Sequence, residues 1–319
     1  MISTLVALAA LLAGVAPPHV PAGYTATVYA RGLVHPTALA LGPSGYVYAT
    51  EQKGRVVSFS QGARTPKVFA SGLQDSTLGL AFTGSRLLVS DKGRVSSFGD
   101  ANRDRVADGR RVLLQGLPNK LHQQDNLAVG PDGRVYLGEG SPCNACAPRA
   151  REASILSFRA DGSDVKIVAT GLRNPFGLAF DPTGALWATD NGRDDLGDAV
   201  PDELNRILPG KRYGYPTCYG IRRGSGCAGT QPAIAELESH SSADGLAFGP
   251  DGAAYVALWG TYFGNKHGRY VVRVDLSNRT PKVTRFATGF DHPLAVLFAK
   301  DGAMLVADWG TGIVWRIAG

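Results

Sequence analysis

Short alternating strands, each following a turn of one kind, dominate the hydrophobic pattern of this chain. The turn reads Gly/Asp-Pro-x-Gly or a shortened form of it, and apolar residues recur at every second position behind it. Proline presets φ and glycine accepts a positive φ, so this turn suits a hairpin between antiparallel strands. Six copies are present, at residues 42–45 before 46–48, 83–85 before 87–89, 130–133 before 135–137, 181–184 before 186–188, 249–252 before 255–256, and 300–302 before 304–306.

The spacing of these copies predicts the architecture. They recur at roughly 40 to 50 residues once the longest gap, between the fourth and fifth copies, is treated as an insertion. That period is typical of one four-stranded blade, and the sequence therefore predicts an all-β fold, a six-bladed β-propeller. A fourth-strand sequence at residues 24–33 has no blade before it, and residues 313–317 end the chain one strand short. We expect the N-terminal strand to close the last blade, because radial closure removes exposed sheet edges.

Length and composition agree with one globular domain over residues 23–319. The chain has 319 residues and a net charge of +6. Its Lys and Arg residues are dispersed, without a basic run interleaved with aromatics, so we expect no nucleic-acid partner. The positive charge favours a negatively charged small molecule as partner, or it belongs to a solvated surface.

The N-terminus resembles a secretory signal. Residues 5–16 form an apolar run too short for a comfortable membrane span, and prolines follow at 17, 18 and 21. No Lys or Arg precedes the run, which departs from the usual pattern. We interpret residues 1–22 as a signal peptide and short linker, and expect a secreted or periplasmic protein with no stable membrane span after cleavage.

The cysteines support export. They fall into two local pairs, Cys143 with Cys146 and Cys218 with Cys227, which we interpret as two disulfides. A zinc site built from all four is the alternative, although the second spacing is long for a zinc knuckle. Haem attachment is disfavoured because Ala147, not His, follows Cys146.

Residues 170–220 are the most specific segment. They contain Gly-Leu-Arg-Asn-Pro at 171–175, Asp-Asn-Gly-Arg at 190–193 and Asp-Glu-Leu-Asn at 202–205. With these phrases the chain resembles the soluble quinoprotein aldose and sorbosone dehydrogenases over nearly all of its length after the signal. These are six-bladed propellers that bind pyrroloquinoline quinone (PQQ) and calcium at the top of the central channel. The resemblance implies a sugar substrate and an electron acceptor as partners.

The resemblance also implies roles for individual residues. His122, which precedes the strand and turn at 126–133, matches the family base that takes the proton of the anomeric hydroxyl as hydride moves to the quinone. Arg173 matches the arginine on the quinone oxygens, where it would stabilise developing negative charge. Gln74, Asn174 and Asn191 match other cofactor contacts. From the residues alone, His122 can equally be a structural histidine, Arg173 a cap between blades, and Gln74 a polar loop residue.

Two calcium sites are candidates. The resemblance implies backbone carbonyl ligands at Gly192 and Arg193 with Asp202 nearby, and a hard cation suits such oxygen ligands. Separately, Asp100, Asn102, Asp104 and Asp108 have the oxygen side chains of the start of a calcium loop. Arg105 stands where that loop needs glycine and Arg111 where it needs an acid, so this segment can also be a polar turn between blades.

The last two blades depart from the family, whose PQQ-binding members carry basic residues there. No cation falls in register, although Lys266, Arg269 or His292 can substitute. Three hypotheses follow. We favour a PQQ-dependent sugar dehydrogenase over a propeller that binds a sugar or a protein and has lost PQQ. The third is a lactonase-like metal hydrolase with His122, Asp125, Asn126 and Asp190 along the channel.

Overall fold

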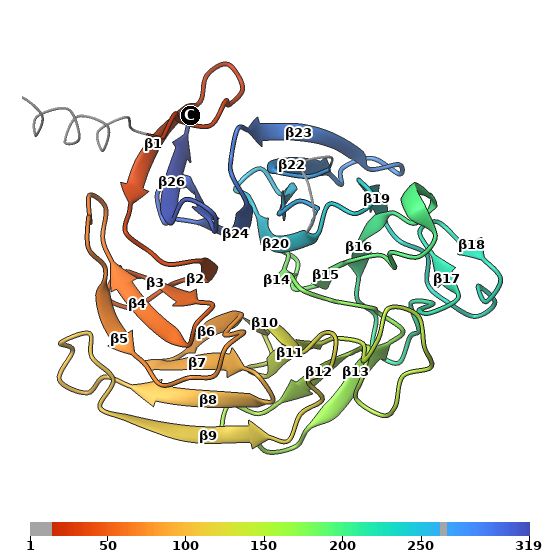
Figure 1. Ribbon diagram of the computed structural model, residues 1–319, viewed down its shortest axis with the longest axis horizontal. Coiled ribbons are helices and arrows are strands. Elements are labelled where there is room, and N and C mark those ends of the chain that lie inside the picture. Colours follow the sequence, from red (N-terminus) through yellow and green to blue (C-terminus); the bar gives the residue numbers. More distant parts are fainter. Residues whose placement is uncertain (1–14, 262–266) are drawn as a thin grey trace, which may run out of the picture.

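The computed structural model describes residues 15–261 and 267–319, and over these residues the strands form six four-stranded antiparallel sheets. Figure 1 shows the sheets arranged radially, with the first strand of each blade nearest the centre. The first three blades are continuous in sequence. Their strands are β2 (Pro36–Leu41), β3 (Val47–Glu51), β4 (Arg55–Phe59) and β5 (Lys67–Ala70); β6 (Gly79–Thr83), β7 (Arg86–Asp91), β8 (Arg94–Gly99) and β9 (Gly109–Gln115); β10 (Gln124–Val129), β11 (Val135–Glu139), β12 (Ser154–Phe158) and β13 (Lys166–Thr170).

The fourth blade contains the insertion that the repeat spacing predicts. A 3-10 helix, η2 (Gly197–Ala199), separates its second and third strands, and a small hairpin precedes its last strand. The strands of blades four and five are β14 (Leu178–Phe180), β15 (Leu186–Asp190), β16 (Asp202–Arg206) and β19 (Ala235–Leu237), with the hairpin β17 (Cys218–Tyr219) and β18 (Arg223–Gly224); and β20 (Ala243–Phe248), β21 (Ala254–Leu258), β22 (Tyr270–Asp275) and β23 (Lys282–Thr288).

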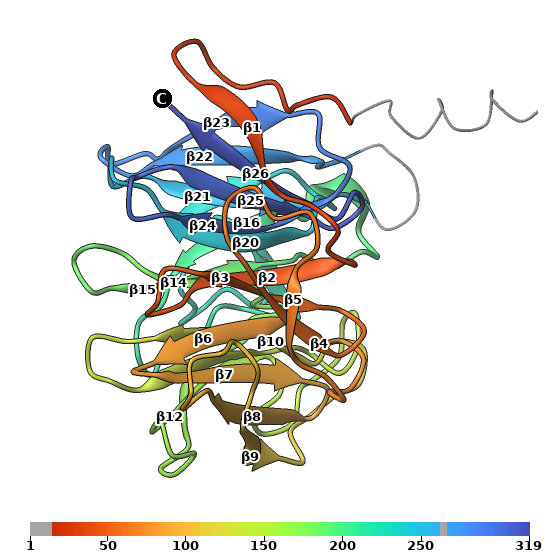
Figure 2. The same cartoon turned by 90° about the vertical axis from the view of Figure 1, so that its left-hand side faces the viewer.

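The sixth blade joins the two ends of the chain, which confirms the predicted closure. It consists of β24 (Pro293–Phe298), β25 (Met304–Asp308), β26 (Ile313–Ala318) and the N-terminal β1 (Thr25–Ala30). In the register, Thr27 pairs with Arg316 and Val28 with Trp315. Figure 2 shows β1 alongside the C-terminal strand in the side view. Closing the ring in this way pairs β1 with the edge of β26 that would otherwise be exposed.

The repeated turn has the geometry its sequence predicts. Gly133 and Gly184 have φ of +75° and +84°, and the corresponding glycines of the other copies also have positive φ. Non-glycine residues reach this region only at a steric cost, so glycine fixes the place where each blade reverses direction.

The core is divided among the blade interfaces. Among the described residues, six apolar clusters each lie between two neighbouring sheets. Between the fifth and sixth blades, for example, Tyr255, Phe286 and Trp315 are buried together. A seventh, small cluster of Leu78, Phe176 and Leu294 comes from three different blades and contacts Trp259 and Trp309. It lies on the ring axis and places an apolar surface below the site described next.

The N-terminal segment is only partly described. Residues 1–14, which contain most of the predicted signal, lie outside the described residues, so that prediction stays a prediction. His19 pairs with Thr288 of β23 through two backbone hydrogen bonds of 2.8 and 2.9 Å. No helix in the described part of the chain is long and apolar enough to cross a membrane.

The two predicted disulfides, Cys143–Cys146 and Cys218–Cys227, are both present and leave no cysteine for the alternative zinc site.

Candidate functional site

A pocket of about 1100 Å³ opens at one end of the ring. Every blade supplies part of its wall, because the loops that enter the first strands and leave the second strands meet at this end. Loops at the channel mouth of a propeller are free to carry function, while the blades hold them in place. The lining residues that matter for the argument are Gln52, His122, Arg173, Asn174, Asn191, Gly192, Asp194, Asp198, Asp202, His240, Asp244, Trp259, His267, His292 and Trp309.

One side of the pocket is aromatic. Trp309 stacks on His35 with ring centroids 4.1 Å apart, and Trp259 lies 4.3 Å from His292. The indole N–H of Trp309 donates to Gln52 Oε1 at 2.9 Å, which fixes the ring. Flat, rigid surfaces of this kind suit a planar ring system or the apolar face of a sugar.

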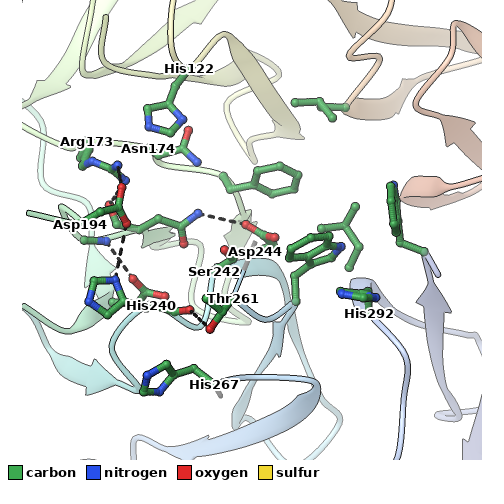
Figure 3. Close-up of a pocket in the computed structure, with 18 of the residues that line it drawn as sticks. His122, Arg173, Asn174, Asp194, His240, Ser242, Asp244, Thr261, His267 and His292 are labelled. Carbon is green, nitrogen blue, oxygen red and sulfur yellow. Dashed lines mark hydrogen bonds and ion pairs between the residues drawn. The ribbon is translucent and has the colours of Figure 1, made fainter. Parts of the chain in front are cut away.

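His122 lies on the opposite, polar side (Figure 3). Its backbone N–H donates to Ser141 O at 3.1 Å. A Cβ atom added to Gly140 would lie only 2.2 Å from the Cβ of His122. Glycine at 140 therefore allows the close approach that places the imidazole. Nε2 is buried and has no hydrogen-bond partner among the described residues. Burial and the positive charge of Arg173 lower the pKa of His122 to about 3, so the ring is neutral near pH 7 and can accept a proton.

Arg173 is held at several points. Nη2 donates to Asp194 Oδ2 at 2.6 Å and to Asn144 Oδ1 at 2.9 Å, and Nη1 donates to Asn191 O at 3.2 Å. Its side chain is 6% exposed, whereas that of Asp194 is 64% exposed. The guanidinium is thus fixed beside His122 by a partner that faces solvent, and such a pair is weaker than a fully buried one.

Two amide side chains beside these residues have an unused oxygen. Asn174 Oδ1 and Asn191 Oδ1 are buried without a partner among the described residues. The other amide atom of Asn191 donates to Asp244 Oδ1 at 3.1 Å, and the backbone N–H of Asn174 donates to Asp190 Oδ1 at 2.7 Å. A buried polar atom without a partner is costly, so both oxygens are suited to a ligand.

Carboxylates crowd the same side. Asp202 accepts from Gly192 N at 2.8 Å and Ser241 Oγ at 3.0 Å, and burial raises its pKa to about 6. Burial also raises the pKa of Asp244 well above the usual range, and the neighbouring charge of Asp202 raises it further. Only Arg173 among the described lining residues is a Lys or Arg. The pocket thus has few positive charges of its own.

The rim between blades four and five carries two further histidines. His240 Nδ1 lies 3.5 Å from Asp194 Oδ1, and His267 Nε2 lies 3.5 Å from Asp198 Oδ1. In Figure 3 both rings lie on the side of the pocket away from His122. They provide polar groups of a kind that recognises hydroxyls.

The structure therefore brings together most of the predicted site. His122, Arg173, Asn174, Asn191, Gly192 and Asp202 all line the pocket. Gln74 does not: its side chain is exposed and its backbone N–H donates to Asp91 Oδ2 at 2.9 Å, while Gln52 lines the pocket instead. The side chain of Arg193 turns to Asp195 Oδ1 at 2.7 Å and Pro216 O at 2.8 Å, a placement that leaves a role for its backbone carbonyl open.

The second candidate calcium loop lies between β8 and β9, away from the pocket, and is tied to itself. Asp100 Oδ1 and Asn102 Oδ1 accept from Asp104 N at 3.0 and 3.1 Å, Asp104 Oδ1 accepts from Val106 N at 2.8 Å, and Asp108 accepts from a backbone N–H. These bonds match the polar-turn interpretation, and the calcium site here stays a prediction. The described residues contain no group of three or more His, Cys, Asp or Glu side chains placed to hold a metal ion.

The basic residues considered for the last two blades, and the residues of the metal-hydrolase hypothesis, reach the pocket only in part. His292 lines the pocket and Arg269 Nη2 lies 3.2 Å from its Nε2, while Lys266 lies outside the described residues. Of the four hydrolase residues only His122 reaches the pocket, and Asn126 Oδ1 accepts from the N–H of Leu127 at 2.9 Å.

Sequence reasoning missed Asn144, Gln52, His267 and Trp309. The blade repeat carries a signal for two of them. Gln52, Asn191, Trp259 and Trp309 each follow directly on the second strand of their blade, and all four line the pocket. Comparing that one position across the repeats would have found Gln52 and Trp309.

Comparison with known protein sequences finds several relatives. Residues 63–213 match a family described as a domain of unknown function, DUF7133. The chain is 25% identical over 238 residues to an uncharacterized protein of Borreliella burgdorferi, covering 65% of this chain and 63% of that protein. It is 32% identical over 150 residues to quinoprotein glucose dehydrogenase B of Acinetobacter calcoaceticus, covering 36% and 30%. It is 25% identical over 281 residues to the aldose sugar dehydrogenase YliI of Escherichia coli, covering 72% and 74%.

Solved structures show the same fold. The holo form of the pyranose dehydrogenase PQQ domain from Coprinopsis cinerea superposes with a TM-score of 0.80 at 18% identity, covering 95% of this chain and 97% of that one. The PQQ-bound aldose sugar dehydrogenase of Streptomyces coelicolor gives 0.75 at 19%, covering 94% and 100%. The chain thus spans less than two thirds of the length of the first two of these curated relatives, 74% of YliI, and nearly all of the solved chains. It is similar in sequence and structure to PQQ-dependent sugar dehydrogenase propellers.

Proposed function

We propose that this protein is an exported quinoprotein-type dehydrogenase that oxidises an aldose or a related sugar aldehyde or hemiacetal, with PQQ as hydride acceptor and Ca²⁺ as Lewis acid. The observation that carries the proposal is the buried Nε2 of His122, which has no partner among the described residues at the pocket wall beside Arg173 and Asn174, in an imidazole whose low pKa keeps it neutral. A base poised in this way needs no prior loss of a proton before it can act. The two disulfides support export into an oxidising compartment.

The pocket residues fit such a cofactor. Arg173 would donate to the oxygens of its polar edge, the unused acceptor oxygens of Asn174 and Asn191 would suit N–H or O–H donors of the cofactor or the sugar, and the Trp259 and Trp309 side would face its apolar surface. Carbonyl oxygens at Gly192 and Arg193 would take calcium, with Asp202 holding that loop through Gly192 N. When bound, PQQ supplies an electrophilic quinone carbon that accepts hydride. A tricarboxylate in a pocket whose described lining has one arginine and no lysine would need added positive charge, which calcium would supply.

The chain's own groups have distinct tasks. His122 Nε2 would receive the proton of the sugar hydroxyl, and the low pKa of this imidazole keeps it unprotonated across the neutral range. Arg173, fixed by Asn144 and Asp194, holds its positive charge where negative charge develops. His240, His267 and the carboxylates beside them offer hydrogen-bond partners to the remaining hydroxyls.

Reconstitution tests the proposal. Purified apoprotein is mixed with PQQ and Ca²⁺, and we expect cofactor absorbance together with sugar-dependent reduction of an artificial electron acceptor. A protein without PQQ and one without Ca²⁺ are the controls. Oxidation of no aldose by the fully loaded protein would overturn the enzymatic proposal.

A second candidate is a propeller that binds a sugar or a protein and has lost PQQ. The excess of carboxylates over cations in the pocket favours it, because an anionic cofactor meets Asp194, Asp198 and Asp202 there. Calorimetric titration with sugars in the absence of PQQ separates the two. Sugar binding without any binding of PQQ would support this second candidate.

A further inference from the structure

Asn144 lies inside the short disulfide loop between Cys143 and Cys146 and contacts Arg173 twice. Its side-chain Oδ1 accepts from Arg173 Nη2 at 2.9 Å, and its backbone carbonyl accepts from Arg173 Nε at 3.3 Å. Two contacts from one residue on adjacent guanidinium nitrogens fix both the position and the plane of the group.

The same side chain also holds the loop that follows β15. Asn144 Oδ1 accepts from the backbone N–H of Asp194 at 2.9 Å, and Asn144 Nδ2 donates to Asp195 Oδ1 at 3.0 Å. Asp194 is the carboxylate that pairs with Arg173. The side-chain amide of Asn144, in the third blade, therefore contacts both Arg173 and the loop that carries its ion-pair partner, Asp194.

The disulfide loop is anchored from outside as well. The hydroxyl of Tyr215, a buried residue, donates to Cys143 O at 2.8 Å and accepts from Cys146 N at 3.1 Å. Ser141 Oγ donates to Cys143 O at 2.8 Å, while Ser141 N donates to Arg173 O at 2.7 Å. Both ends of the loop are thus tied down next to the backbone of the residue that Asn144 contacts.

We propose that Asn144 is a positioning residue for Arg173, and that the Cys143–Cys146 disulfide serves this site by holding Asn144 in place. An arginine side chain loses much rotamer freedom when it is fixed, and a partner that is already rigid lowers the cost at the moment of ligand binding. The disulfide removes freedom from a loop that has no strand of its own. The consequence for PQQ rests on the proposed function, whereas the positioning of Arg173 does not.

The test compares four proteins with the wild type. Asn144→Ala removes the side-chain contacts, and Asn144→Asp keeps the acceptor for Arg173 and for Asp194 N. Cys143→Ser/Cys146→Ser opens the loop. Cys218→Ser/Cys227→Ser is the matched control, because that disulfide closes the β17–β18 hairpin and none of the hydrogen bonds of Arg173 in the described residues goes to this hairpin. Serine variants are used in place of a thiol reductant because quinones react with thiols. Thermal unfolding checks that each variant is folded.

Two readouts are taken. Phenylglyoxal labelling of arginine, followed by peptide mass spectrometry, reports the protection of Arg173, whose side chain is 6% exposed. Arg94, at 26%, is the internal reference in each sample. Fluorescence titration of apoprotein with PQQ in the presence of Ca²⁺ gives the affinity.

We expect phenylglyoxal to label Arg173 faster in Asn144→Ala and in the Cys143/Cys146 variant than in the wild type. Both variants should bind PQQ roughly tenfold more weakly, which corresponds to the loss of one charge-assisted hydrogen bond. Asn144→Asp should keep most of the protection of Arg173, because it retains that acceptor, while it loses the hydrogen bond donated to Asp195 Oδ1. The Cys218/Cys227 variant should match the wild type. Unchanged labelling of Arg173 in folded Asn144→Ala overturns the positioning role whether or not PQQ binds. Failure of the wild type to bind PQQ overturns the proposed function, and the labelling still decides the role of Asn144.

Discussion

The neutral state of buried His122 predicts an unusual pH dependence of stability. The pKa of this imidazole is lowered from 6.5 to about 3, mainly by burial and further by Arg173. Below pH 6.5 the unfolded chain binds a proton at this histidine that the folded chain does not bind. Stability contributed by the site is therefore complete above pH 6.5 and is lost progressively as the pH falls toward 3.

The magnitude follows from the shift. Each pH unit in this window changes the free energy of unfolding by about 1.36 kcal/mol, so the two units between pH 6.5 and 4.5 amount to about 2.7 kcal/mol. Replacing His122 with Gln removes the titrating group and keeps a polar side chain of similar length. On going from pH 7 to 4.5, wild-type protein should lose about 2.7 kcal/mol more than His122→Gln.

Urea unfolding at the two pH values measures this difference directly, since all other titrating groups are shared by the two proteins. Imidazole NMR spectra provide an independent check, with the His122 signal assigned by its absence from the Gln variant. We expect that signal to keep its neutral pattern at pH 4.5. Equal pH dependence of the two proteins, or an imidazolium pattern at pH 4.5, would refute the argument that burial holds this ring neutral.

Three further predictions concern activity, closure and covalent structure. His122→Ala should lower turnover by roughly 10²- to 10⁴-fold while the affinity for PQQ is retained. Arg173→Ala should lower both turnover and PQQ affinity. Full turnover of the His122 variant in stopped-flow assays would show that another residue is the base, with His240 and His292 the next to test. A protein lacking residues 1–32 loses β1 and the pairing of Thr27 with Arg316, so its calorimetric transition should be broader and lower than that of the full mature form. A transition as sharp and as high would contradict the role of β1 in closure. Peptide mapping without reductant should recover Cys143–Cys146 and Cys218–Cys227 from exported protein, and four free thiols would remove this argument for an oxidising compartment.

The sequence alone was sufficient for the architecture. A turn that needs proline and glycine recurs at a blade-length period, and local backbone preference decides where each strand begins and reverses. The unpaired strand at the N-terminus and the missing strand at the C-terminus indicated the closure of β1 on β26, which the structure confirms. The short cysteine spacings likewise predicted both disulfides, because pairs close in sequence are close in space.

The site depended on contacts between blades, which no local pattern reports. Family motifs predicted His122, Arg173 and Asn174, all of which line the pocket, but they also pointed to Gln74, whose side chain faces solvent while Gln52 of the preceding blade takes a place in the wall. Asn144 gave no signal in the sequence because its importance comes from reaching across to Arg173 and Asp194 in another blade. Burial, which lowers the pKa of His122 and raises that of Asp244, is likewise a property of the closed ring, since it depends on how completely neighbouring blades exclude water.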